Sequence, residues 1–264
     1  MTGWGEHQLT DGRTVTLRWA GPDDAPGIAR LFMALSPESF HSRFHGGRVG
    51  PALALRLARL DPGSGMACVV ACPTADPDQI AAEARYVPMD ESAAEIGLTV
   101  ADDYQGTGLG HILLDVLVRR ARESGLRRLR ALVSLANGPM LHLLEPYGWV
   151  LAEPADLAVA CLEISAAGGM PGWPEQVTGR KVLVEQRSFF ENYQVAALRA
   201  AGDEIRQCAG PRRVTGRACP LVTDGRCRLA EEADLILPLL PGDDEDCARV
   251  LEAHRERWPG RLAR

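Results

Sequence analysis

Residues 94–110 read AEIGLTVADDYQGTGLG, and this stretch decides the fold. Residues 94–100 predict a strand, and the apolar side chains at helical spacing from Ile112 onward predict a helix. Between them, residues 105–110 form a glycine-rich turn. Glycine lets the backbone approach an anion closely, and the N-terminus of the following helix adds the positive end of a dipole. The turn therefore predicts a binding site for a pyrophosphate.

Similar glycine-rich turns also occur in P-loop proteins, in dinucleotide-binding folds, and in ordinary connections from a strand to a helix that bind no ligand. An ordinary connection from strand to helix needs no ligand, and three glycines alone do not exclude it. The turn lacks the Lys-Ser/Thr ending of a P-loop. It also follows several predicted strands, whereas the turn of a dinucleotide-binding fold follows the first. The surrounding sequence has to decide between these interpretations.

The surrounding sequence resembles the GNAT acetyltransferase superfamily. The family pattern Gln/Arg-x-x-Gly-x-Gly/Ala is matched by Gln105, Gly108 and Gly110, and residues 94–100 are similar to the family's central strand. Asn137 and the pair Gly148-Trp149 resemble later landmarks of the family. The resemblance covers residues 10–165 and implies an α/β (α+β) fold, with a mixed central sheet flanked by helices.

The resemblance also implies a binding site for acetyl-CoA as cosubstrate, and no metal is expected. Backbone groups of the strand would pair with pantetheine, and the turn would hold the pyrophosphate. The residues that the resemblance assigns to the coenzyme are Leu98, Thr99, Val100, Gln105, Gly106, Thr107, Gly108, Leu109, Gly110 and Asn137.

Acetyl transfer to an amine needs a group that accepts a proton, because a lysine side chain with a pKa of about 10.4 is protonated at pH 7. The resemblance implies Glu95 as this general base, and a solvated glutamate at the end of a strand is the alternative. Asp102 and Asp103 are weaker candidates. Many family members carry a tyrosine as general acid after the asparagine, but Leu144 occupies that place here.

Residues 35–44 read LSPESFHSRF and resemble a segment of bacterial protein lysine acetyltransferases. The same residues also predict the start of a helix, with Ser36 as its N-cap and Pro37 in its first position. The predicted function is therefore transfer of acetyl from acetyl-CoA to an amine, with a protein lysine as acceptor. Two alternatives remain, a small-molecule amine acetyltransferase and an acyl-CoA sensor module that controls the C-terminal domain.

The composition excludes several other classes of protein. Among the 264 residues, 46% are hydrophobic and 24% charged, as in a soluble globular protein, and no segment predicts a membrane span or a signal peptide. The net charge is −6 without a block of cations, so nucleic acid is not an expected partner. We expect a cytoplasmic protein with reduced thiols, among which Cys68 and Cys72 pack in the core.

The chain is expected to hold two domains. Residues 8–165 form the acetyltransferase domain, residues 166–179 are rich in Ala, Gly and Pro and form a linker, and residues 180–264 form a second domain. The alternation of strands and helices in the second domain predicts a small flavodoxin-like parallel α/β unit, whose role is open and includes regulation.

Three cysteines of the second domain allow several interpretations. Cys208, Cys219 and Cys227 are too widely spaced for a typical zinc site. A metal site, a redox-responsive thiol pair and plain structural cysteines all remain open. Arginines flank the cluster and would lower a thiol pKa if they came close. These arginines are Arg212, Arg213, Arg217, Arg226 and Arg228.

Overall fold

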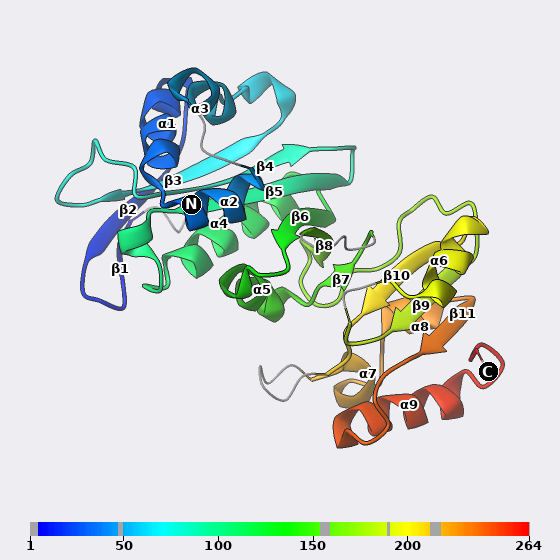
Figure 1. Ribbon diagram of the computed structural model, residues 1–264. Coiled ribbons are helices and arrows are strands. Elements are labelled where there is room, and N and C mark those ends of the chain that lie inside the picture. The colour runs from blue at the N-terminus through cyan, green and yellow to red at the C-terminus, as the bar shows by residue number, and fades with distance from the viewer. Residues whose placement is uncertain (1–4, 47–49, 154–158, 189–190, 212–217, 264) are drawn as a thin grey trace. The chain divides into compact units, whose positions relative to one another are not determined.

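The computed structural model describes residues 5–46, 50–153, 159–188, 191–211 and 218–263 (Figure 1). The chain divides into two compact units, Met1–Ala131 and Leu132–Arg264, and the dividing point lies within strand β6. The predicted linker at residues 166–179 remains a prediction. Within the described ranges, no helix combines the length and the apolar character that a membrane crossing requires.

The first unit contains both strands and helices. Its elements are β1 (Glu6–Gln8), β2 (Thr14–Trp19), η1 (Pro22–Asp24), α1 (Ala25–Ala34), α2 (Pro37–Phe44), α3 (Pro51–Ala58), η2 (Pro62–Ser64), β3 (Ala67–Pro73), β4 (Ala82–Pro88), β5 (Ala93–Val100), η3 (Asp102–Tyr104), α4 (Leu109–Glu123) and β6 (Arg128–Ser134).

The strands of this unit form one mixed sheet. Neighbouring strands pair in antiparallel fashion from β1 to β5. Strand β6 then pairs with β5 in parallel, as a strand after a crossover helix does. The predicted mixed central sheet is therefore confirmed.

Helices cover both faces of the sheet. Helices α1 and α3 lie on one face, where Ile28 and Phe32 pack against Val70 and the buried Cys68. Helix α4 covers the other face (Figure 1), and at its end the hydroxyl groups of Tyr86 and Ser124 lie 3.0 Å apart. The predicted core position of Cys68 is confirmed.

Local sequence explains where the helices begin. Ser36 caps α2 as predicted, because its Oγ accepts a hydrogen bond of 3.2 Å from the N–H of Ser39. Helix α4 begins after Gly108, whose φ of +84° is a conformation that glycine adopts without strain. Helix α4 thus starts directly at the glycine turn.

The second unit contains shorter elements. They are α5 (Gly138–Leu144), η4 (Glu145–Tyr147), β7 (Val150–Leu151), β8 (Val159–Ser165), β9 (Lys181–Glu185), α6 (Tyr193–Ala200), β10 (Glu204–Cys208), α7 (Pro220–Thr223), α8 (Arg228–Glu232), β11 (Leu235–Pro238) and α9 (Glu245–Arg257). The sequence also predicts a strand over residues 157–164, of which residues 157 and 158 lie outside the described residues.

Three parallel strands form the centre of this unit. Strand β9 pairs in parallel with β10 on one side and with β11 on the other, which confirms the predicted small parallel sheet. Strand β7 adds an antiparallel partner to β10, and β8 pairs with β7. The fold class predicted from the sequence is therefore correct for both parts of the chain.

Candidate active site

Strand β5 changes its pairing halfway along its length. It stays paired with β4 up to Val100, whereas its register with β6 ends at Glu95, opposite Arg130. The N–H of Ala101 donates to Ala81 in the chain next to β4 at 2.9 Å. Because backbone groups alternate in an antiparallel ladder, those of Leu98 and Val100 point to the other edge of β5.

This edge fits the predicted pantetheine site at two of the three strand residues. Leu98 and Val100 present their backbone groups there, as expected for pairing with an extended ligand. Thr99 is directed elsewhere. Its backbone faces β4, and its side chain is only 4% exposed, because Oγ1 donates a hydrogen bond of 3.0 Å to Oε1 of Glu83.

The glycine turn offers a row of backbone donors. Gly106 and Gly108 have φ values of +71° and +84°, so the backbone curls before α4 begins. In the part of the chain that the structure describes, the N–H groups of residues 106–110 have no protein acceptor. The first N–H groups of a helix carry a partial positive charge. The turn therefore has the donors that a pyrophosphate needs.

Two side chains of the turn hold its shape. The hydroxyl of Thr107 donates to the carbonyl of Tyr104 at 2.6 Å, which closes the turn. The amide of Gln105 lies 3.0 Å from Oγ of Ser39 and 3.2 Å from the carbonyl oxygen of Val100. Gln105 thus connects the turn to the end of β5 and to α2.

Two residues that the sequence analysis singled out, Asn137 and Leu144, lie in the second unit. Oδ1 of Asn137 accepts a hydrogen bond of 3.0 Å from the N–H of Met140, so that Asn137 is the N-cap of α5. Leu144, at the place where many relatives carry a tyrosine, is fully buried and offers no proton. The described residues therefore provide no general acid at that position.

Glu95 lies on the face of β5 that α2 covers. Glu95, Gly97 and Thr99 alternate along the strand and so share one face. The Glu95 side chain is exposed, and the guanidinium of Arg43, from the last turn of α2, lies directly over Gly97. Arg43 attracts the Glu95 carboxylate electrostatically. Glu95 is thus a solvent-accessible carboxylate beside the end of the β5–β6 pairing.

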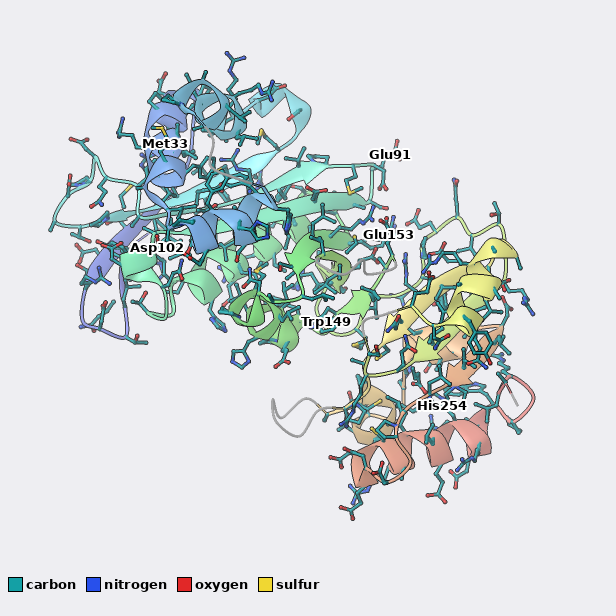
Figure 2. The ribbon with its side chains drawn as sticks, viewed as in Figure 1. Met33, Glu91, Asp102, Trp149, Glu153 and His254 are labelled. Atoms are coloured by element: carbon teal, nitrogen blue, oxygen red, sulfur yellow. The ribbon has the colours of Figure 1, made fainter. Side chains whose placement is uncertain are left out.

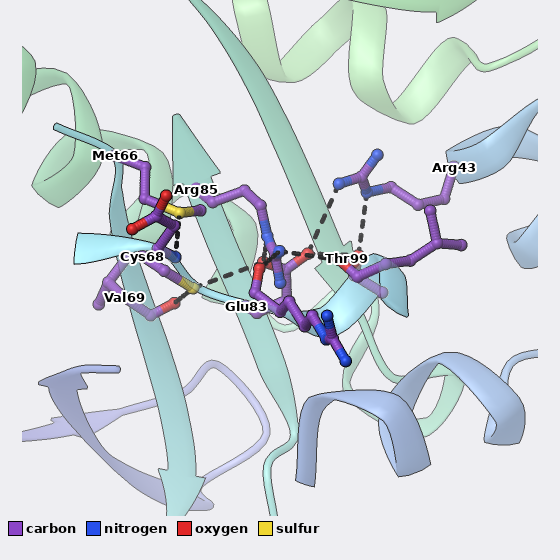
Figure 3. A network of polar contacts seen from close by, with 10 residues as sticks. Arg43, Met66, Cys68, Val69, Glu83, Arg85 and Thr99 are labelled. Atoms are coloured by element: carbon purple, nitrogen blue, oxygen red, sulfur yellow. Dashed lines mark hydrogen bonds and ion pairs between the residues drawn. The ribbon is translucent and has the colours of Figure 1, made fainter. Parts of the chain in front are cut away.

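A buried ionic network fixes α2 on this face (Figure 3). At its centre, the fully buried Glu83 accepts a hydrogen bond of 2.7 Å from Nε of Arg85 and lies 3.6 Å from Nη2 of Arg43. Nε of Arg43 donates to Thr99 at 3.1 Å. Burial raises the pKa of Glu83, but the two guanidinium groups outweigh it and hold the pKa below its usual value. The carboxylate stays ionised.

Sequence reasoning missed this network. Arg43, Glu83 and Arg85 lie far apart in the chain, and each alone looks like a solvated charge. One signal was available, because a glycine inside a strand marks a place where other groups approach closely. A Cβ on Gly97 would stand only 2.1 Å from Nη2 of Arg43.

Asp102 anchors the other end of α2 (Figure 2). Its carboxylate accepts hydrogen bonds from the N–H of Ser36 at 2.7 Å and from the hydroxyls of Ser36 and Ser39. Burial acts to raise the pKa of Asp102, yet these donors lower it overall. Asp103 is exposed, and its carboxylate lies 4.0 Å from Arg13. Asp102 is therefore engaged in a structural role.

Three cysteines of the second unit line one small cavity of about 20 Å³, enough for a single water. Cys208, Cys219, Cys227 and Glu185 are among its lining residues. Oε1 of Glu185 lies 2.9 Å from Nε2 of His254, a buried residue of α9 (Figure 2). Among the described residues, no three His, Cys, Asp or Glu side chains are placed to hold a metal ion.

Two thiols of this cavity, those of Cys219 and Cys227, do not carry the lowered pKa that nearby arginines would give them. Burial raises the pKa of Cys219 to about 11 and that of Cys227 to about 12. Arg226 and Arg228 are mostly exposed and pair with glutamates instead, and the three flanking arginines at 212, 213 and 217 lie outside the described residues. These two thiols are therefore protonated at neutral pH.

Comparison with known proteins identifies the family. The model of the Acetyltransferase (GNAT) family matches residues 37–149. Acetyltransferase PA5475 of Pseudomonas aeruginosa is 33% identical over 152 residues, which cover 55% of this chain and 82% of that protein. The chain belongs to the GNAT family of acetyl-CoA-dependent acetyltransferases. The family match includes the turn, β5 and α2.

Two further relatives carry the name Pat or PAT. Acetyltransferase Pat of Mycolicibacterium smegmatis is 36% identical over 87 residues, which cover 32% of this chain and 26% of that protein. The crystal structure of the GNAT domain of S. lividans PAT superimposes with a TM-score of 0.54 at 25% identity and covers 62% of this chain and 98% of that domain. The match to Acetyltransferase Pat thus spans about a quarter of the length of that relative.

Proposed function

We propose that this chain transfers the acetyl group of acetyl-CoA to the side-chain amine of a protein lysine, with Glu95 as general base. The observation that supports this most is the position of Glu95. Its exposed carboxylate stands on β5 where the pairing with β6 ends, on the face that α2 covers. Leu98 and Val100, further along the same strand, present backbone groups to the open edge.

The coenzyme would be held along the strand and at the turn. Backbone groups of Leu98 and Val100 would pair with the pantetheine amides, and the N–H groups of residues 106–110 would bind the pyrophosphate. The thioester would then lie near the middle of β5. The coenzyme supplies a carbonyl carbon that is activated towards attack by an amine.

The chemical step forms one bond and breaks another. The neutral amine attacks the thioester carbonyl, the new C–N bond forms, and the C–S bond breaks. Glu95 takes the proton that the amine loses, directly or through a water molecule. The departing thiolate belongs to a thiol whose pKa is near 8.5 in the cysteine reference, so it leaves without a strong acid. Leu144, which cannot donate a proton, is therefore compatible with departure of the thiolate.

Residues 35–44 favour a protein lysine over a small amine as acceptor. They form α2 and the residue pair before it, and they resemble the corresponding segment of protein lysine acetyltransferases. The similarity to Acetyltransferase Pat and to the S. lividans PAT domain supports the same class. The resemblance to the family also implies Asn137 as a coenzyme-binding residue, and we propose this role for it.

An acceptor panel tests this function. The full chain is incubated with acetyl-CoA and either a mixture of folded bacterial proteins or a set of small amines, and the release of free thiol is followed. We expect release that depends on the protein acceptors, with acetyl-lysine detected in them by mass spectrometry. Release with small amines alone would assign the chain to small-molecule acetylation. Tight acetyl-CoA binding without any acceptor-dependent release would favour a sensor.

A further inference from the structure

We infer that Asp102 and Gln105 transmit coenzyme binding to α2, so that acetyl-CoA tightens the helix that covers the Glu95 face. This inference rests on the proposed coenzyme site. It makes Asp102 a positioning residue, since its carboxylate touches α2 and the turn residue Gln105 but no reacting atom.

The first observation is that α2 is fixed at both of its ends. At its N-terminus, the N–H and the hydroxyl of Ser36 donate to Asp102, and Ser39 donates to the same carboxylate. At its C-terminal end, Arg43 reaches the buried carboxylate of Glu83. The C-terminal attachment is buried, whereas the N-terminal one is exposed to solvent and so easier to change.

The second observation is that Gln105 has more acceptors than donors. Its side-chain amide has two N–H groups. Nε2 lies 3.0 Å from Oγ of Ser39, 3.2 Å from the carbonyl oxygen of Val100 and 3.3 Å from Oδ1 of Asp102. Three acceptors therefore share two donors, and each of the three hydrogen bonds is weaker than it would be alone.

The third observation is that one of these acceptors belongs to the proposed coenzyme site. The carbonyl of Val100 points to the edge of β5 beyond the pairing with β6. An amide N–H of pantetheine that pairs with this carbonyl satisfies it from outside the protein. Gln105 then directs both of its donors to Ser39 and Asp102, and the N-terminal attachment of α2 becomes stronger.

Linkage makes this effect reciprocal. If the coenzyme stabilises the attached form of α2, then attachment of α2 raises the affinity for the coenzyme by the same factor. Couplings of this kind commonly amount to a factor of about 5 to 150. The acceptor surface beside Glu95 would then be completed when acetyl-CoA is bound, which favours binding of the coenzyme before the acceptor.

Hydrogen exchange on the full chain tests the inference without relying on activity. We expect acetyl-CoA to slow exchange in the turn at residues 106–110 and, by a factor of about 5 or more, in α2. The probe 3′-phosphoadenosine 5′-diphosphate lacks the pantetheine arm. It is expected to protect the turn but to leave exchange in α2 unchanged, because nothing then pairs with Val100.

Three variants sharpen the test. Asp102→Asn and Ser39→Ala each remove a partner of the network, so acetyl-CoA should still protect the turn while its effect on α2 is lost. Asp103→Asn is the matched control, because the neighbouring carboxylate lies outside the network. Should Asp102→Asn fail to fold, Ser39→Ala carries the test alone.

The results separate the inference from the proposed function. Protection of the turn with no slowing of α2, or with equal slowing in Asp102→Asn and Ser39→Ala, would overturn the coupling and leave the coenzyme site standing. Absence of protection at the turn would remove the coenzyme site and the coupling together.

Discussion

At Gly97, a single hydrogen atom in place of a side chain leaves room for the guanidinium of Arg43. A Cβ there would stand 2.1 Å from Nη2, and Arg43 cannot move away without leaving Thr99 and the buried Glu83. We predict that Gly97→Ala destabilises the protein by about 1–3 kcal/mol, as overpacking commonly does. Urea unfolding measures this change.

A matched glycine substitution provides the control for Gly97→Ala. Gly242 has no neighbour within 4 Å of a built Cβ and no positive φ, so Gly242→Ala should leave the unfolding midpoint nearly unchanged. Equal midpoints for both variants would show that Arg43 adapts freely and would weaken the role we assign to the network.

At the scale of single residues, the sequence predicted what lies within a short motif. The glycines of the turn and the N-cap Ser36 were each predicted from their immediate neighbours, whereas Glu95 as general base rests on the resemblance and stays a prediction. The contacts of Arg43 with Glu83 could not be predicted, because they join residues that only the completed sheet brings together. The hydrogen bonds of Asp102 to α2 could not be predicted for the same reason.

Among the elements, α9 offers a test of how stability depends on pH, because its N-cap is the carboxylate of Asp244. The pKa of Asp244 is about 2, below its ordinary 3.8, because the N–H of Cys247 and the guanidinium of Arg187 favour the carboxylate against the opposing effect of burial. The ionised cap therefore stabilises the folded chain above pH 3.8, and this contribution is lost as the pH falls towards 2.

The loss of stability on replacing the cap residue Asp244 should show the same pH dependence. We predict that Asp244→Ala is less stable than the wild type at pH 6 and that the difference shrinks as the pH falls from 3.8 to about 2. Asp243→Ala, at the exposed neighbouring carboxylate, should behave as the wild type at both ends of this range. Unfolding in urea at several pH values measures the difference, and a constant difference would contradict the account.

The elements themselves were largely predictable, and their length explains which were not. Strand β2 shows the alternation that makes a strand recognisable, because Val15 and Leu17 are buried between exposed residues. Helices α7 and α8 were missed, because four or five residues are too few to show helical periodicity. Strand β1, three residues long, was missed for the same reason.

For the molecule as a whole, we predict that two of the seven thiols, Cys219 and Cys227, resist alkylation while the chain is folded. With pKa values of about 11 and 12, only on the order of one thousandth of Cys219 or less is thiolate at pH 8, and still less of Cys227. We expect iodoacetamide to leave both unmodified in the folded chain and to label them after unfolding in urea. Peptide mass spectrometry reads the labelling, and rapid labelling of folded Cys227 would contradict this.

The proposed general base is tested most directly by replacing Glu95 while following acceptor-dependent thiol release from acetyl-CoA. General base catalysis contributes a factor of about 100 to 10,000, so Glu95→Gln should lower kcat/KM for the acceptor by about 100-fold or more. Binding of acetyl-CoA should be retained. Glu91→Gln, at an exposed glutamate shortly before β5 (Figure 2), should leave the rate unchanged. Thiol release that survives Glu95→Gln at the wild-type rate would contradict the account.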